Sequence, residues 1–362
     1  MIIPISEPSL EGNEKKYLME TVASSWISSA GEFVSKFEHS FSDYCGVKHG
    51  VATANGTVAL HLALVALGIG KGDEVVVPNL TFAATINSVL YTGATPVIVD
   101  IEQESWCISP EEIEKAITKK TKAIIPVHLF GQPCDMERIC DIANKYNLKI
   151  VEDCAQAHGA EYLGSKVGSF GDINCFSFYG NKIVTTGEGG MCVTNDTELN
   201  DKMRILKDHG MSKTKRYYHE VVGFNYRMTN MQSAIGAAQM ERIDEMLMWR
   251  KELEKAYKSR FSEIQHLQLQ KDDLANRKKV TWLISALVPA KKRNNCVQKL
   301  GEAGFDTRVF FYPLSSMSIY KSYVFSDKIS TAIAEQGINF PTIRRLSNEN
   351  IDDMAKILRD CL

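Results

Sequence analysis

The sequence predicts an α/β protein with a largely parallel sheet that helices cover on both faces. Short apolar runs rich in β-branched residues alternate with helical patterns between residues 74 and 153, and this alternation is typical of such a sheet. The chain has 362 residues, more than one core usually holds, so a second, smaller domain is expected. Parallel sheets bind ligands at the carboxyl ends of their strands, and functional residues are expected there.

The N-terminal part is expected to open with helices. Residues 14–24 and about 32–44 are predicted to be helical, and the Ala- and Leu-rich residues 58–67 favour a buried helix. Strands and helices then alternate, with strands at 74–78, 95–100, 123–128 and 149–153 and helices at 81–92, 109–118 and 134–147.

The rest of the chain leads into the second domain. We expect apolar strands around Phe176 and at 191–194, a helix at 198–209, a polar loop at 211–226, and one long helix from 231 to about 261. A strand at 280–288, a helix at 290–303, a strand at 306–312 and terminal helices follow. The expected domains are therefore residues 1–261, which include the long bridging helix, and residues 262–362, a smaller α+β domain.

Composition argues against several classes of protein. The net charge is −2 with acidic and basic residues interspersed, so we expect neither nucleic acid nor a membrane as a partner. Two charge-free windows, residues 51–70 and 75–99, are divided by Pro, Gly and Asn, which favours buried elements over membrane spans. The nine cysteines lack CxxC spacing, and residues 1–10 lack a signal-peptide pattern. No metal site and a reducing, cytoplasmic location are therefore expected.

Lys182 is the predicted chemical centre. It lies between an aromatic strand and a Thr-Thr-Gly turn that leads into another apolar run. Backbone on both sides can aim such an amine and partly desolvate it, which favours Schiff-base chemistry. A single loop lysine is more often a surface residue, so the assignment depends on other residues.

Three features support it. Asn55-Gly56-Thr57 precedes the helix at 58–67, and a helix N-terminus favours phosphate, although the same residues can simply cap the helix. Asp153 ends a strand at the ligand edge, where it can meet a cationic group, cap a helix or form an exposed ion pair. Phe82 lies at the same edge, unless it packs in the core.

These residues together fit one cofactor. Pyridoxal 5'-phosphate needs a lysine for its aldehyde, a carboxylate for its ring nitrogen, an aromatic ring to stack on it and donors for its phosphate. Lys182, Asp153, Phe82, and Gly56 with Thr57 supply this set. Pyridoxal 5'-phosphate is therefore the predicted cofactor, with pyridoxamine 5'-phosphate as the intermediate form.

Several motifs carry a family resemblance. They are Asn55-Gly-Thr-Val-Ala-Leu, Glu152-Asp-Cys-Ala-Gln-Ala, Phe176-Ser-Phe-Tyr-Gly-Asn-Lys and Thr185-Thr-Gly-Glu-Gly-Gly. With them the chain resembles, nearly end to end, the DegT/DnrJ/EryC1/StrS sugar aminotransferases. The resemblance implies the aspartate-aminotransferase fold, which is fold type I of the pyridoxal-phosphate enzymes. It also implies transfer of an amino group from L-glutamate to a keto sugar in surface polysaccharide biosynthesis. Related dehydratases carry histidine in place of Lys182.

The resemblance also assigns residue roles. Lys182 and Asp153 would be catalytic, and Gln156 would contact the 3-oxygen of the cofactor ring while Phe82 stacks on it. The phosphate would be held by Gly56, Thr57 and Ser177, and by Asn225 from the second subunit of a homodimer with shared active sites. The substrate would contact Trp26, Tyr179, Asn181, Arg308 and Tyr312, although a core position is the alternative for Trp26.

The acceptor is less closely specified. Ser-Phe-Tyr-Gly-Asn-Lys and Trp26-Ile-Ser-Ser resemble family members that aminate C4 of GDP-4-keto-6-deoxymannose. Changes at Val309 and Ser318, in a segment that shapes the acceptor pocket in relatives, leave a smaller phosphorylated ketone as an alternative. A non-catalytic regulatory protein with the same fold is a third hypothesis, against which the intact Lys182 and Asp153 argue. Glu188 is a minor candidate, and His128, His158 and His209 are expected to be structural.

Overall fold

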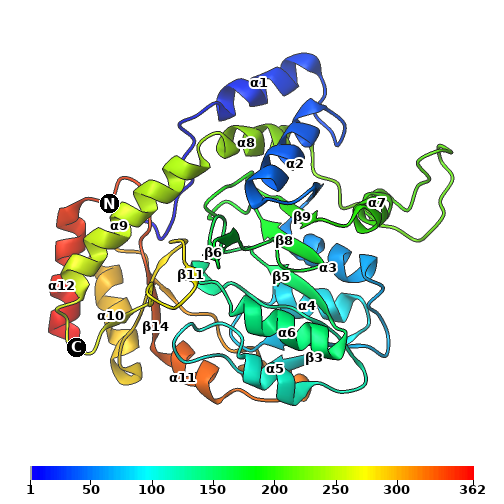
Figure 1. Cartoon of the computed structure of the whole chain (residues 1–362). Coiled ribbons are helices and arrows are strands. Elements are labelled where there is room, and N and C mark those ends of the chain that lie inside the picture. The colour runs from blue at the N-terminus through cyan, green and yellow to red at the C-terminus, as the bar shows by residue number, and fades with distance from the viewer. Residues whose placement is uncertain (1) are drawn as a thin grey trace.

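The computed structural model describes residues 2–362 and has a seven-stranded sheet at its centre (Figure 1). The strand order is β1-β9-β8-β5-β4-β2-β3. β9 runs antiparallel to β8 and β1, and the other neighbouring pairs are parallel, which confirms the predicted mostly parallel sheet. The strands are β1 (His49–Thr53), β2 (Glu74–Pro78), β3 (Thr95–Val99), β4 (Thr121–Ile124), β5 (Lys149–Asp153), β8 (Ile173–Ser177) and β9 (Gly190–Thr194).

Helices cover both faces of the sheet because alternate strand residues point to opposite sides. Val75 and Val77 pack in a cluster with α3 (Gly56–Ala66), α4 (Ala84–Tyr91) and α7 (Thr197–Leu206). Val76, between them, packs on the other face with α5 (Pro110–Ala116) and α6 (Met136–Tyr146). The alternation of strands and helices expected from the sequence is thus confirmed, with ends that differ by a few residues.

The predicted single helix from residue 231 to 261 is wrong. α8 (Asn230–Met240) ends before Arg242, whose φ of −126° is not helical, and α9 (Ile243–Phe261) then begins. α8 packs on α1 (Glu14–Ser24) and α2 (Glu32–Cys45), whereas the second half of α9 packs in a C-terminal cluster. The break lets the two helices bury their apolar residues in different cores.

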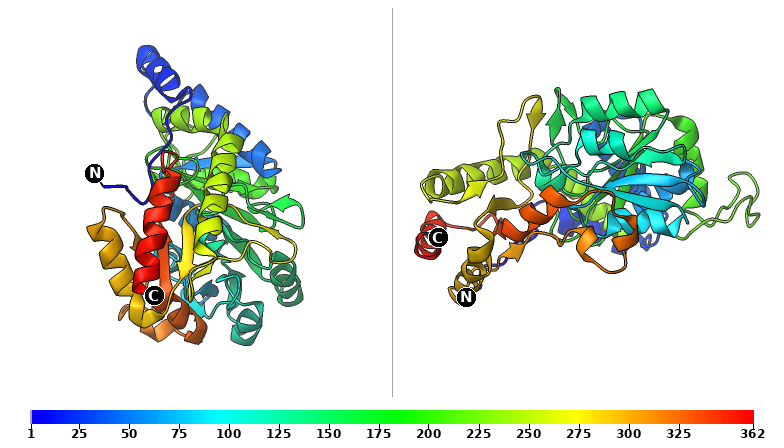
Figure 2. Two further views of the ribbon diagram at one scale, coloured as in Figure 1. Left: turned by 90° about the vertical axis from the view of Figure 1, so that its left-hand side faces the viewer. Right: turned by 90° about the horizontal axis from the view of Figure 1, so that it is seen from below.

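That C-terminal cluster surrounds a four-stranded antiparallel sheet. α12 lies beside α9 at one end of the molecule (Figure 2). The strands predicted at 280–288 and 306–312 are shorter than expected, and the domain boundary at residue 262 stays a prediction. The elements are β10 (Gln268–Leu269), β12 (Ile284–Leu287), β13 (Arg308–Val309), β14 (Gly337–Phe340), α10 (Ala290–Glu302), α11 (Lys328–Gln336) and α12 (Asn348–Cys361).

Short elements complete the fold. A small sheet pairs β11 with β6 and β6 with β7, and the predicted loop at 211–226 projects from the body between α7 and α8 (Figure 1). Across residues 2–362, no helix combines the length and the apolar character that a membrane span requires. The remaining bounds are β6 (Glu161–Tyr162), β7 (Ser165–Lys166), β11 (Arg277–Lys278), and the 3-10 turns η1 (Leu129–Gly131), η2 (Leu314–Ser316) and η3 (Lys321–Tyr323).

Candidate active site

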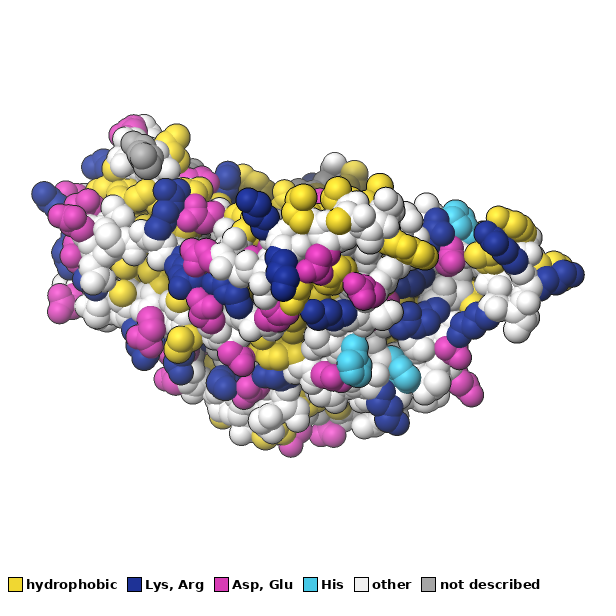
Figure 3. Space-filling model, turned by 90° about the horizontal axis from the view of Figure 1, so that it is seen from above, with side chains coloured by type: hydrophobic (Ala, Val, Ile, Leu, Met, Phe, Trp, Pro, Cys, Tyr) yellow, Lys and Arg dark blue, Asp and Glu magenta, His cyan; other side chains and the backbone are white. Residues whose placement is uncertain are grey.

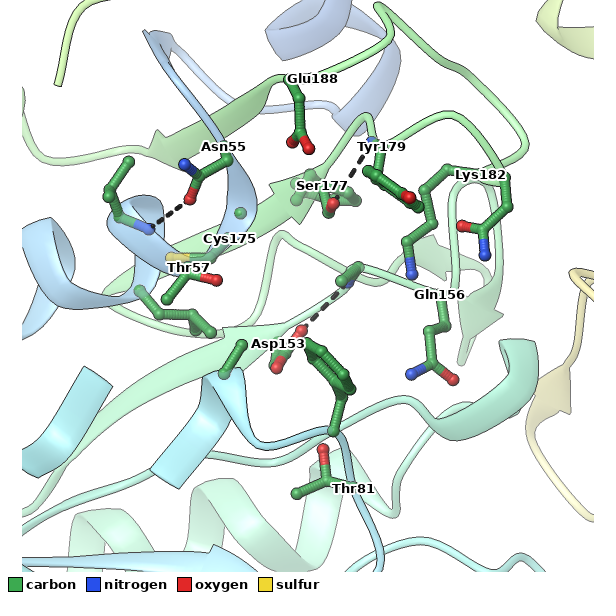
Figure 4. A pocket seen from close by; sticks show the side chains of 18 of the residues that line it. Asn55, Thr57, Thr81, Asp153, Gln156, Cys175, Ser177, Tyr179, Lys182 and Glu188 are labelled. Carbon is green, nitrogen blue, oxygen red and sulfur yellow. Dashed lines mark hydrogen bonds between the residues drawn. The ribbon is translucent and has the colours of Figure 1, made fainter. Parts of the chain in front are cut away.

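A cavity of about 600 Å³ opens at the carboxyl edge of the central sheet (Figure 4). β1, β5 and β8 end at this edge, because the strand register pairs Asp153 with Cys175 and the antiparallel β9 links Ser177 to Thr53 through Gly190. The cavity brings together nine of the residues predicted from the sequence, which are Gly56, Thr57, Phe82, Asp153, Gln156, Ser177, Tyr179, Asn181 and Lys182.

Lys182 points its amine into this cavity. Its backbone N–H donates to the Tyr179 carbonyl at 2.9 Å, which fixes the turn after β8. The side chain is half-buried, and burial lowers its pKa to about 8, although the charge of Asp153 opposes the shift. A lysine with this pKa supplies far more neutral amine at physiological pH than an ordinary lysine does.

Asp153 lies buried in the wall of the same cavity. Its Oδ2 accepts a hydrogen bond from Thr85 Oγ1 at 2.9 Å, and its Oδ1 accepts one from the Ala155 N–H at 3.2 Å. Burial raises its pKa, while these two donors and the Lys182 charge act in the opposite direction. An exposed ion pair, one alternative from the sequence, is therefore wrong for this carboxylate, and its role toward a cationic group stays a prediction.

The N-terminus of α3 presents free hydrogen-bond donors at the cavity. The side chain of Asn55 caps the helix by accepting from the Val58 N–H at 3.0 Å. Within residues 2–362, the N–H groups of Gly56 and Thr57 have no acceptor, and the Thr57 and Ser177 hydroxyls line the same cavity. A Cβ at Gly56 would lie 2.7 Å from the Ser177 Cβ, so glycine allows the close approach. These donors fit a phosphate group.

Two further side chains fit the ring of the predicted cofactor. Phe82 is 58% exposed and lines the cavity, so core packing, the alternative from the sequence, is wrong for it. Gln156 accepts the Phe130 N–H through its Oε1 at 2.8 Å, which leaves its NH₂ group free to donate into the cavity (Figure 4). The donor set therefore fits pyridoxal phosphate at the amine, the ring and the phosphate.

The other predicted residues lie outside the cavity of this chain. Trp26 is 59% exposed, so the core position considered for it is wrong. Tyr312 is 65% exposed, and Arg308 pairs with Asp306 at 3.1 Å. Asn225 lies at the base of the projecting loop, where it accepts from Arg227 Nε at 3.0 Å. The substrate roles of the first three, and the role of Asn225 in a second subunit, stay predictions.

Sequence reasoning missed two cavity neighbours. Thr85 lies one helical turn after Thr81 and donates to Asp153, and this i, i+4 spacing of hydroxyls was the available signal. Trp282 lines the cavity beside Lys182. It lies 100 positions after Lys182 in the sequence, and none of the family motifs contains it. Only folding brings them together.

Two of the histidines predicted to be structural have a side-chain partner, and that of His209 is Arg227, whose Nη2 lies 3.3 Å from Nε2 of the ring. His128 Nε2 lies 2.9 Å from Glu152 Oε2, and both side chains are fully buried. Among the described residues, His128, Glu152 and Cys154 are the one group with the spacing of metal ligands. Three backbone N–H groups, from Gly168, Phe170 and Gly171, already occupy the Glu152 carboxylate, so this cluster is a satisfied network.

Comparison with known proteins gives a consistent result. The sequence pattern of the DegT/DnrJ/EryC1/StrS aminotransferase family matches residues 8–359. A GDP-perosamine synthase of Escherichia coli O157:H7 is 45% identical over 350 residues, which cover 96% of this chain and 95% of the relative. A GDP-perosamine synthase of Caulobacter vibrioides is 45% identical over 364 residues, which cover 99% and 98%.

A protein of Streptococcus pneumoniae described as a sugar aminotransferase, solved in PLP and PMP forms, has a similar structure. For its PMP form the TM-score is 0.94 at 29% identity, and the match covers 100% of this chain and 98% of that one. The predicted pyridoxal-phosphate aminotransferase fold and the family resemblance, including the finer one to GDP-perosamine synthases, are confirmed.

Proposed function

Because the chain belongs to the DegT/DnrJ/EryC1/StrS aminotransferase family, we propose that it moves the amino group of L-glutamate to C4 of GDP-4-keto-6-deoxymannose. The family membership makes the chain a sugar aminotransferase that depends on pyridoxal 5'-phosphate. The proposal adds the donor, the acceptor and the residues that act on them. The observation that carries it is the amine of Lys182, which faces the buried Asp153 in one cavity with the free donors of α3.

The cofactor, when bound, accepts the electrons released at the donor's α-carbon and stores the amino group between the two halves of the reaction. Lys182 would hold its aldehyde, and Asp153 would keep its ring nitrogen protonated. The Gly56 and Thr57 N–H groups, with the Thr57 and Ser177 hydroxyls, would bind its phosphate, while Phe82 and Gln156 would fix the plane of its ring.

Lys182 would also move the proton. When Lys182 is not bound to the cofactor, its amine would be free, and its pKa of about 8 lies close to physiological pH, where a general base is most effective. The neutral amine would take a proton from the α-carbon of the donor and deliver it to the cofactor carbon that carries the amino group. For the keto sugar it would move a proton in the opposite direction, from that cofactor carbon to the sugar carbon.

The nature of the acceptor rests on the relatives. Two chains 45% identical to this one carry the name GDP-perosamine synthase, which supports a GDP-linked 4-keto-6-deoxy sugar and a role in surface polysaccharide biosynthesis. The notable alternative is a smaller phosphorylated ketone. Tyr179, Asn181 and Glu188 line the cavity and are placed to contact either acceptor.

We further propose a homodimer in the cytoplasm. The projecting loop exposes apolar side chains, among them Tyr217 at 76% and Val222 at 90%, and it carries several basic residues at one end of the molecule (Figure 3). Exposed apolar groups on a projecting segment favour contact with a partner. In a dimer in which this loop packs on the second copy, Asn225 would also be able to reach the cofactor phosphate in the active site of that copy.

A substrate comparison tests the acceptor. The purified enzyme with cofactor and L-glutamate is given GDP-4-keto-6-deoxymannose, a UDP-linked 4-keto sugar or a small phosphorylated ketone, and the amino product is measured by mass spectrometry. We expect the highest kcat/KM for the GDP sugar, with the K182A variant as the inactive control. Preferred turnover of the small ketone would favour the alternative, and full activity of K182A would refute the role of Lys182.

A further inference from the structure

The amine of Lys182 lies against Trp282, a residue to which the proposed function gives no role. Nζ is 4.0 Å from the centroid of the indole ring. In the part of the chain that the structure describes, Nζ has neither a hydrogen-bond acceptor nor a carboxylate within ion-pair distance. The aromatic face is therefore the contact that fixes the free amine.

Trp282 is itself held at several points. Its Nε1–H donates to the carbonyl of Asn181, the residue before Lys182, at 2.8 Å. Its own carbonyl accepts from Nη1 of the buried Arg250 at 3.0 Å, and its ring stacks near Phe130 with centroids 6.2 Å apart and planes at 21°. Trp282 is only 4% exposed, so burial and these contacts fix the ring with one face toward the amine.

The backbone just before Trp282 also contacts the segment that holds the residues expected around the cofactor. The Val280 N–H donates to the Gly131 carbonyl at 3.1 Å, and Gly131 has φ of +90° and no space for a side chain, because a Cβ would lie 2.0 Å from the Val280 carbonyl oxygen. Phe130, next to it, donates its N–H to Gln156. The segment of Trp282 is thus locked to the wall that holds Gln156.

We infer that Trp282 is a positioning residue that holds the amine of Lys182 at the cavity wall whenever this lysine is not bound to the cofactor. The inference rests on the proposed function, in which Lys182 is free between the two halves of the reaction. An indole face attracts an ammonium group, and a fixed amine avoids the entropy that a free lysine side chain would lose at each turnover.

Other charged groups face the same space. Burial of Lys182 outweighs the attraction of Asp153 and lowers the pKa of the amine to about 8. Besides Asp153 and Lys182, the titratable side chains that line the cavity are Glu188, Tyr91, Tyr179 and Cys175. Arg250 donates to the Trp282 carbonyl, and the charge of Lys182 helps to lower the pKa of the buried His158.

Intrinsic fluorescence of the full chain without cofactor tests the contact. An ammonium group against an indole quenches its emission, so we expect emission to rise as Lys182 loses its proton, with a midpoint near pH 8. The W282F variant and the K182M variant, which keeps a side chain of similar length without charge, should both lack this step. A step that persists in either variant would overturn the inference.

Kinetics test the role. Replacing the indole by leucine removes the aromatic face, so W282L should lower kcat about tenfold, with KM for L-glutamate nearly unchanged because Trp282 acts on the lysine. W282F keeps a ring and should lose less. W249L is the matched control, since Trp249 also contacts Arg250 but does not line the cavity. W282L with the kcat of W249L would refute the positioning role.

The two proposals fail differently. If the fluorescence step is present in the wild type and absent in both variants but L-glutamate is not used as a donor, the contact stands and the proposed function fails. If L-glutamate and the GDP sugar are turned over and W282L is fully active, the proposed function stands and the role of Trp282 fails.

Discussion

Replacing Thr85 by valine should lower the activity of the cofactor site while keeping its shape. The valine has the volume of threonine but lacks the hydroxyl that donates to Asp153 Oδ2 at 2.9 Å. Both side chains are buried, and a hydrogen bond to a buried charged group stabilises it by about 1.5–3 kcal/mol. Asp153 would keep only the longer bond from Ala155, at 3.2 Å, so its pKa, already raised by burial, would rise further.

The expected loss follows from that energy. A carboxylate whose charged form is destabilised by about 1.5–3 kcal/mol would stabilise a protonated ring nitrogen of the cofactor less well, so kcat/KM should fall by roughly 10- to 100-fold. The assay is steady-state amino transfer with the loaded enzyme, together with a pH titration of the cofactor's absorbance. T85S restores the hydroxyl and should recover most of the activity. Wild-type kcat/KM in T85V would refute the account of how Asp153 is held.

Other predictions address the remaining parts of the site. K182A should lose activity by about 100-fold or more, and borohydride should link the cofactor to the wild-type peptide but not to the variant. G56A should weaken cofactor binding, measured by spectral titration, because its Cβ would lie 2.7 Å from the Ser177 Cβ. The rate of the acceptor half should rise with pH through about 8, since the neutral amine of Lys182 would be the base in the proposed reaction; a rate that falls over this range would contradict the assignment. D153N should abolish activity yet raise the Tm of the cofactor-free protein at neutral pH. Burial raises the pKa of this carboxyl, so its charged form costs stability above that pKa, and the Tm gain should disappear as pH falls.

The cofactor half of the site was predictable from the sequence because its residues lie in short motifs next to strand ends. Asp153 and Ser177 end neighbouring parallel strands, and Gly56 opens the helix after β1. The rule that such strand ends meet at one edge is enough to bring them together with Lys182, without any knowledge of the C-terminal part.

The partners of these residues were harder to predict. Trp282 reaches Lys182 from a distant segment, through contacts with Arg250 and Asn181 that no periodicity encodes. The break at Arg242 was missed because residues 231–261 have no Pro and no Gly after Gly236, and the end of α8 is set by packing on two cores rather than by a local signal. The predicted substrate residues Trp26, Arg308 and Tyr312 lie outside the cavity of one chain, and none of them lies at the end of a strand of the central sheet.

The most direct test of the central claim follows the cofactor's absorbance through both halves of the reaction. Adding L-glutamate alone to the loaded enzyme should remove the long-wavelength band of the lysine-bound cofactor, and GDP-4-keto-6-deoxymannose should restore it with formation of an amino sugar. A band that L-glutamate leaves unchanged, or that only a small phosphorylated ketone restores, would contradict the proposed reaction.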